Sequence, residues 1–266
     1  MLHQMVLGFV ILAVIFIPLE RLRPLYPGQA IFRSGWFTDV IHFFISRVLI
    51  QVGTYAGAVL FYILLHRLLH TPFQAAITSQ PAWLQFLEAY LVAETSFYSL
   101  HRLSHAVPWL WKFHAIHHSS ENLDWLASVR LHPVEMIMVN LTIGVPLALL
   151  GFSAQTFGVY TIVSTFLAIL NHANVRVSYG PLRWLVADPH YHHWHHANQR
   201  EAINKNFAGL PLLDFLFGTL YIPKNIWPQR YGVDEYIGKD YLSQLSYPFR
   251  KSNARKEPEF ETYWPG

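Results

Sequence analysis

Long apolar segments separated by short polar or aromatic connections run through most of the chain. A bilayer core of ~30 Å is crossed by about 20 helical residues, so such segments are typical of membrane-spanning helices. The run Leu210–Leu220 has 11 residues and suits an interfacial or packed segment instead. The pattern predicts an all-α, integral-membrane helical bundle with about four to five transmembrane segments. The apolar segments are Met5–Leu19, Val40–Leu65, Pro81–Leu100, Val134–Gly151 and Gln155–Leu170.

The first segment is followed, rather than preceded, by positive charge at Arg21 and Arg23. A secretory signal peptide carries its charge before the apolar run and a small-residue cleavage site after it. We therefore expect a transmembrane helix whose C-terminal end is cytoplasmic, by the positive-inside rule. A buried or interfacial helix is the alternative.

The last two apolar segments, Val134–Gly151 and Gln155–Leu170, are joined by an uncharged connection. They form a hairpin or two full spans, and either returns the chain to the side it left. Aromatic and basic residues, which belong at the headgroup level, fill Ala106–Pro133. We predict a multi-pass membrane protein with a histidine-rich cap on its cytoplasmic side.

Composition agrees with a membrane protein, since 53% of the 266 residues are hydrophobic and 13% are charged. The charged share is about half that of soluble domains. Cysteine is absent, which excludes disulfides, iron–sulfur clusters and thiolate zinc sites within the chain. The net charge of +3 comes with no basic run or nucleic-acid motif, so basic loops beside a bilayer explain it and nucleic acid is not expected as a partner.

Histidines provide the candidate chemistry, because twelve of the 16 lie between His101 and His196. They form three clusters with spacings of i, i+4 or i, i+3, i+4, which place imidazoles on one face of a helix. Neutral imidazole is the commonest metal ligand, and eight of them exceed what one tetrahedral ion uses. The spacing indicates a two-metal site. The clustered residues are His101, His105, His114, His117, His118, His192, His195 and His196.

The motifs HRLSH, HAIHH and HHWHH resemble the HxxxH, HxxHH, HxxHH pattern of the fatty acid hydroxylase/sterol desaturase superfamily, which comprises integral-membrane histidine-box di-iron oxidoreductases. The similarity extends to RLHP, NHAN, KNFAG and LFGTLY and covers roughly residues 88–221. It implies that the eight clustered histidines and His172 of NHAN are metal ligands and catalytic residues. For His172, a helix-end histidine capped by Asn171 is the alternative.

Besides Asn171, three further residues are candidates for an additional ligand or for contact with a ligand. His132 is either a tenth ligand or an outer residue, and His190 could shape the mouth of the cavity. Glu94 shares a helical stripe with His101; it either accepts a hydrogen bond from a ligand imidazole or an intervening donor, or it is an interfacial acid. His193 should point away from the ligand face, and His42, outside the boxes, is expected at the interface.

All-nitrogen ligation suits iron, zinc or copper. Zinc cannot change oxidation state, and the glutamate of the HExxH hydrolase motif is replaced by Arg102. The resemblance implies two iron ions, with zinc a possible substitute, and dioxygen as co-substrate. We expect hydroxylation or desaturation of a lipid, such as a fatty acyl chain or sterol, drawn from the bilayer. A membrane metal-binding or metal-transport protein without oxidase activity is the alternative, although transporter ligands usually lie near the midplane.

No haem, flavin or nicotinamide motif occurs in the sequence, so electrons must come from an external electron donor, a separate protein or reductant. Lys112, Arg102, Arg130 and Arg200 could help to dock an acidic donor. We interpret 1–266 as a single membrane domain. Its parts are membrane spans over 1–87, a histidine-box catalytic region over 88–221 and a cytoplasmic tail over 222–266.

Overall fold

The computed structural model describes residues 2–250, and these residues form helices and connecting segments without a β-strand. The predicted all-α fold is confirmed. Two isolated bridges, Pro24 with Val175 and Ala197 with Tyr231, are the extended pairings among the described residues. The α-helices are α1 (Leu2–Leu22), α2 (Trp36–Ile41), α3 (Arg47–Leu65), α4 (Pro72–Thr78), α5 (Ala82–Ala106), α6 (Pro108–His118), α7 (Pro133–Leu150), α8 (Ala154–His172), α9 (Pro189–His195), α10 (Pro211–Leu216) and α11 (Tyr241–Ser246).

Four helices are long and apolar enough to cross a membrane, in agreement with the predicted number of about four to five. The second is continuous from α2 into α3 through a π-helical segment, His42–Ser46. Few residues of these four helices are buried within the protein, so their apolar side chains are available to lipid. The four spans are Leu2–Leu22, Trp36–Leu68, Pro133–Leu150 and Ala154–His172.

Helix α5 has 25 residues but is not one of the four apolar candidates. Polar residues interrupt it, and its last turns carry the first histidine box. Small buried residues, Ala89 and Ala93, let it pack closely against Ile143 and Leu147 of α7 and Tyr160 of α8. The expected third span over Pro81–Leu100 is therefore a helix packed between α7 and α8, with its polar stripe turned to protein.

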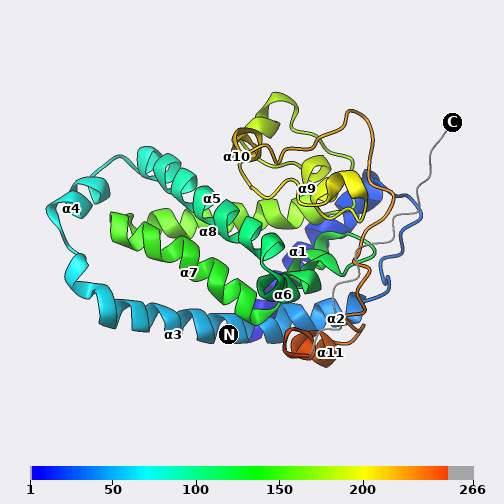
Figure 1. Ribbon diagram of the computed structural model, residues 1–266, viewed down its shortest axis with the longest axis horizontal. Coiled ribbons are helices and arrows are strands. Elements are labelled where there is room, and N and C mark those ends of the chain that lie inside the picture. Colours follow the sequence, from blue (N-terminus) through cyan, green and yellow to red (C-terminus); the bar gives the residue numbers. More distant parts are fainter. Residues whose placement is uncertain (1, 251–266) are drawn as a thin grey trace.

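The long helices share two ends, and the chain runs back and forth between them (Figure 1). At one end, Gln74 and Thr78 of α4 donate hydrogen bonds to the carbonyls of Leu149 and Gly151, at the C-terminal end of α7. Helices α5 and α8 start at this end and α3 and α7 finish there. All three histidine boxes consequently lie at the opposite end.

The first helix also finishes at the histidine end. The Glu20 carboxylate accepts hydrogen bonds from the backbone N–H groups of Trp125 and Asn174, at 2.8 and 2.9 Å. Phe16 packs against Trp125 and Ile169 in an apolar cluster below this contact. A carboxylate therefore joins the end of α1 to the two loops that flank the metal-ligand candidates.

Short helices in the cap begin with local signals that the sequence carries. The Asp188 side chain accepts from the Tyr191 N–H and caps α9, and Pro189 occupies its first turn. Proline also begins α6 and α7. The first N–H groups of a helix have no acceptor within the helix, so a proline there removes no hydrogen bond. These signals place the second and third boxes on helices, as their spacing predicted.

The segment after α10 is folded against the cap over its described part. Tyr231 donates to or accepts from His193, Ile237 packs on Ala115 and Ile116, and Gln244 of α11 bonds to His42. The interfacial position expected for His42 is wrong, because this side chain is buried between Ser46 and Gln244. The remainder of the expected tail, 251–266, lies outside the described residues.

Candidate metal centre

Nine imidazoles gather at one end of the bundle and form two groups. Within each group, one nitrogen from every ring lies within 4.8 Å of the others. The nine are the same residues that the histidine boxes and NHAN had indicated as candidates. The first group is His101, His105, His114, His118 and His195, and the second is His117, His172, His192 and His196.

The helical spacing divides each of two boxes between the groups. In α6, His114 and His118 are separated by one turn and face the first group, while His117 faces the second. In α9 the division is reversed, since only His195 reaches the first group. The i, i+3, i+4 pattern therefore lets one helix serve two sites.

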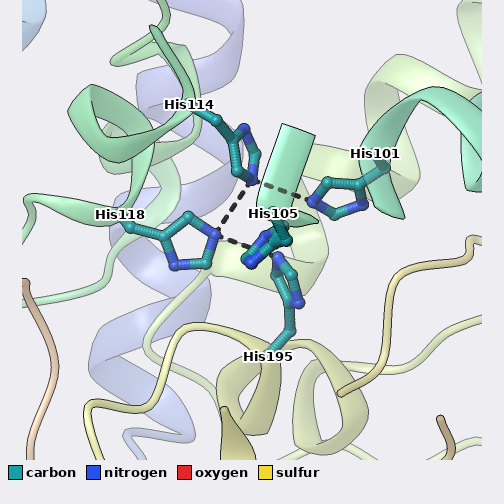
Figure 2. A group of neighbouring side chains, drawn as sticks. All are labelled: His101, His105, His114, His118 and His195. Carbon is teal, nitrogen blue, oxygen red and sulfur yellow. Dashed lines mark hydrogen bonds between the residues drawn. The ribbon is translucent and has the colours of Figure 1, made fainter. Parts of the chain in front are cut away.

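The first group is drawn in Figure 2, where rings from α5, α6 and α9 converge. Its Nε2 atoms lie 2.9 Å apart between His101 and His114, 3.0 Å between His114 and His118, and 3.1 Å between His118 and His195. The His105 ring packs edge-on to those of His101 and His114. All five side chains approach from the walls of one small space.

The second group has the same spacing between ring nitrogens. Nε2 of His172, at the end of α8, lies 3.1 Å from Nε2 of His117 and 3.1 Å from that of His192. His192 and His196 repeat the distance at 3.1 Å. The two groups adjoin, because the rings of His118 and His196 stack with centroids 4.4 Å apart.

The outward nitrogens of these rings determine which tautomer is present. Nδ1 of His101 donates to the Phe207 carbonyl at 2.6 Å, and Nδ1 of His195 donates to the Lys205 carbonyl at 2.9 Å. In the second group, Nδ1 of His172 donates to the Ala168 carbonyl at 2.7 Å. A carbonyl oxygen can only accept, so each Nδ1 carries the ring proton and each inward Nε2 carries a lone pair.

Glu135 at the start of α7 has the same role toward His114, and sequence reasoning did not identify it. The His114 Nδ1 lies 2.5 Å from the Glu135 carboxylate, and both side chains are buried. A carboxylate behind a ligand imidazole orients the ring and raises its basicity. Nothing in the local spacing signals this contact, because the two residues are on different helices.

Burial keeps four of the imidazoles in α6 and at α9 neutral. Desolvation lowers the pKa of His195 to about 3 and lowers the pKa of His118, His192 and His196 well below the ordinary value. Neighbouring imidazoles add to the effect in all four cases. Neutral imidazole is the form that binds a metal ion.

The two groups fit metal ions on this donor chemistry. Each group contains one pair of rings whose Nδ1 protons are both turned outward. The pairs are His101 with His114 and His117 with His172, and in each the two inward Nε2 lone pairs face one another at about 3 Å. Such contacts are repulsive unless a cation lies between them. Two nitrogens at about 2.1 Å from one ion and at right angles are about 3 Å apart, which matches the observed separations.

Three other histidines of the segment from His101 to His196 lie outside both groups. His132 caps α7, accepting from Val134 N–H at Nδ1, while its Nε2 donates to the Leu245 carbonyl. Nε2 of His190 donates to the Ile226 carbonyl. His193 bonds to Tyr231 and the Ala173 carbonyl, so it points away from the ligand face, as expected. Both ring nitrogens of His132 are therefore occupied by the protein, which argues against a tenth ligand.

An apolar cavity of about 250 Å³ lies between α5, α7 and α8 and reaches both groups. His101 of the first group and His192 of the second form part of its wall. Glu94 and Asn171 line the same cavity. Glu94 is buried and accepts a hydrogen bond from the Tyr160 hydroxyl of α8, so it is not an interfacial acid, and among the described residues it forms no hydrogen bond with an imidazole.

A smaller and more polar cavity of about 100 Å³ approaches the histidines from the other side. His105, His118, His195 and His196 form its inner wall. Its outer wall includes Asp234, within the segment that follows α10. The histidine groups consequently separate an apolar cavity in the bundle from a polar cavity in the cap.

The expected role of Arg130 in docking an acidic donor is wrong. Its guanidinium is buried and pairs with Asp39, with a nitrogen–oxygen distance of 2.6 Å. Arg33 pairs with Asp39 at 2.8 Å and with Asp124 at 2.6 Å. Arg130 instead holds the loop after α6 onto α2, and its carbonyl accepts from His117 Nδ1.

Comparisons with known proteins agree with the geometry. The sequence signature of the family described as Fatty acid hydroxylase matches residues 86–219. Ornithine lipid hydroxylase OlsE of Rhizobium tropici is 30% identical over 254 residues, which are 90% of this chain and 73% of that protein. Alkylglycerol monooxygenase of Homo sapiens is 31% identical over 132 residues, 49% of this chain and 29% of its own length. No solved structure matches the chain.

Proposed function

The chain belongs to the fatty acid hydroxylase family, and on that premise we propose that it is a membrane-embedded, dioxygen-dependent lipid hydroxylase or desaturase with two iron ions. One observation supports the metal assignment above all others. In each histidine group, ring lone pairs face one another at about 3 Å. The nine histidines in two groups are accordingly proposed as ligands and catalytic residues, and region 88–221 as the catalytic part of a single membrane domain.

Iron held by these histidines would supply redox-active chemistry toward dioxygen, which zinc in the same place could not. The protein's own contribution is orientation. The Phe207, Lys205 and Ala168 carbonyls hold three rings by their Nδ1 protons, and Glu135 holds a fourth. These partners are backbone or buried groups, and they set the direction in which each ring presents its Nε2.

The apolar cavity is the proposed binding site for the lipid chain. It opens along α5, α7 and α8, two of which are candidate spans, so a lipid could reach it from the bilayer. Phe97 and Phe207 form part of the wall near His101. Aromatic walls exclude water from the reacting carbon, which favours oxidation of the lipid over wasteful side reactions.

Electrons for the reaction are proposed to come from a separate donor. The chain contains no cysteine, and oxidation of one C–H bond by dioxygen consumes two external electrons. The polar cavity offers a route to four of the histidines from the cap surface. A donor bound there would be separated from the lipid by the histidines themselves.

The histidine end is proposed to face the cytoplasm. Arg21 and Arg23 lie where α1 ends, and that end contacts the loops beside the histidines through Glu20. Cytoplasmic loops carry an excess of such basic residues. The position of both groups at the helix ends, rather than midway along the spans, also favours an enzyme over a transporter.

Metal analysis of detergent-purified protein followed by lipid profiling tests this function. We expect about two iron ions per chain and, in cells that express the protein, a lipid that gains one oxygen or loses two hydrogens. The His117→Ala variant should lose that product, and Glu121→Gln, an exposed acid, serves as the control. A stoichiometry near one ion, or an active His117→Ala variant, would contradict the proposal.

A further inference from the structure

Two polar side chains lie in the wall of the apolar cavity without a complete set of hydrogen-bond partners. Glu94 is 5% exposed and Asn171 is 7% exposed, and they come from different helices, α5 and α8. Glu94 Oε2 and Asn171 Oδ1 are buried and have no hydrogen-bond partner in the part of the chain that the structure describes. Buried polar atoms are rarely left unpaired, so a bound molecule is expected to supply the partner.

The surroundings of Glu94 hold its carboxylate in a defined orientation. The Tyr160 hydroxyl donates to Oε1 at 3.1 Å. On the other side, a Cβ added to Gly209 would lie 2.3 Å from Oε2, so the absence of a side chain there makes room for the carboxylate. The amides of Gly209 and Leu210 are close by, but neither forms a hydrogen bond of ordinary geometry with Oε2. One oxygen is therefore fixed and the other is available.

Both available atoms are hydrogen-bond acceptors. A carboxylate and an amide oxygen accept from O–H or N–H groups. A cation is disfavoured as their partner, because most of the cavity wall is apolar and burial of a charge there is costly. A neutral hydroxyl or amide N–H has a much smaller cost of burial and satisfies the same acceptors.

The position of Glu94 along α5 sets its distance from the histidines. Glu94 precedes His101 by seven residues, which is two turns and roughly 10 Å along a helix. Asn171 adjoins His172 of the second group. A lipid whose donor binds at Glu94 would thus place chain atoms about 10 Å away beside the first group.

We infer that Glu94 forms a polar anchor for a hydroxyl or amide N–H of the lipid substrate, while Asn171 is a separate acceptor beside the second histidine group. The substrate class is thereby narrowed to lipids that carry such a donor roughly 10 Å from the oxidised carbon. This inference rests on the proposed function for the identity of the cavity as the substrate site. It assigns Glu94 to substrate recognition rather than to the metal ligands.

The test compares lipids that differ only in hydrogen-bond donors. One pair is a long-chain alkylglycerol and its di-O-methyl ether, and a second is a long-chain secondary amide and its N-methyl derivative. Equilibrium binding is measured on metal-free and on iron-loaded full-length protein in detergent, together with KM and kcat. For wild type we expect the donor-bearing member of at least one pair to bind about tenfold more tightly, which is the size of effect that one buried hydrogen bond typically has.

The variants separate recognition from folding and from metal binding. In Glu94→Leu, the ratio of the affinities for the two lipids of a pair should fall to about one. Tyr160→Phe, which removes the hydrogen bond that holds the Glu94 side chain, should give an intermediate ratio. Glu94→Gln preserves the shape of the side chain and tests the anchor if Glu94→Leu does not fold. Its affinity ratio for the two lipids of a pair should also be lower than that of wild type. Glu88→Gln, on the same helix but outside the cavity, should bind as wild type does.

Two results would overturn the anchor: wild type without preference in either pair, or a preference that survives in both Glu94→Leu and Glu94→Gln. Failure of the proposed function looks different. In that case the metal-free protein still prefers the donor-bearing lipid, but iron-loaded wild type oxidises no lipid of either pair. Oxidation without any preference would retain the enzyme and remove the anchor.

Discussion

Glu135 shows how one residue that is not a ligand candidate can control the site. We expect Glu135→Gln to weaken iron binding by about 10–100-fold, because residues that orient a ligand imidazole typically contribute that much. The loss arises at His114, whose Nδ1 proton would face a neutral amide in place of a carboxylate. A chelator competition assay measures the change, and exposed Glu121→Gln is the control. Unchanged iron affinity in Glu135→Gln would refute this role.

Alanine substitution of His193 and of His117 should have different effects on iron binding, although both residues belong to the histidine boxes. His193 is fully buried and bonds to Tyr231 and Ala173, so His193→Ala should retain two iron ions but unfold at a lower temperature. A buried hydrogen-bonded group contributes about 1–3 kcal/mol, and each kcal/mol corresponds to roughly 2–4 °C in a protein of this size. His117→Ala should instead lose iron. Iron loss in His193→Ala would show that it is a ligand.

Elements far apart in the sequence are joined by the buried network of Asp39 with Arg33 and Arg130. Asp39→Asn should destabilise the protein by about 3–5 kcal/mol, because it leaves buried guanidinium charge unpaired. Asp234→Asn, which breaks the exposed pair with Arg230, should change stability by at most about 1 kcal/mol. Chemical denaturation of the two variants gives the comparison, and equal effects would contradict it.

The sequence predicted those parts of the centre that depend on spacing within one helix. The three boxes needed only helical periodicity, whereas His172 needed resemblance to a family, because it is alone in its segment. The division of α6 and α9 between two groups was not predictable, since it depends on how the helices pack. Glu135, Arg130 and His42 have partners on other elements, and such pairings leave no periodic signal.

The orientation of the whole molecule is testable because the natural chain has no cysteine. Ser79→Cys near α4 and Asn225→Cys in the cap are exposed positions toward opposite ends of the bundle. With the histidine end in the cytoplasm, an impermeant thiol reagent should label only Ser79→Cys in intact cells. Asn225→Cys should react after permeabilisation. The reverse pattern would place the centre on the outer side.

Repeated turnover requires the whole molecule together with an external electron donor. Isolated, iron-loaded protein with lipid and dioxygen should give at most a single turnover, because its sequence contains no recognised haem, flavin or iron–sulfur motif. Product measured against protein concentration should exceed one equivalent only when an external reductant is added. Sustained turnover without a donor would reveal a redox centre that the sequence does not show.

The sharing of α6 and α9 between the two histidine groups has a consequence for assembly. An ion bound by the first group immobilises His114, His118 and His195, and with them the helices that carry His117, His192 and His196. The second ion then binds to ligands whose conformational entropy has already been lost, which is positive cooperativity without a change of shape. Iron titration should accordingly be sigmoidal, and chains that hold a single ion should be scarce at every stage of loading.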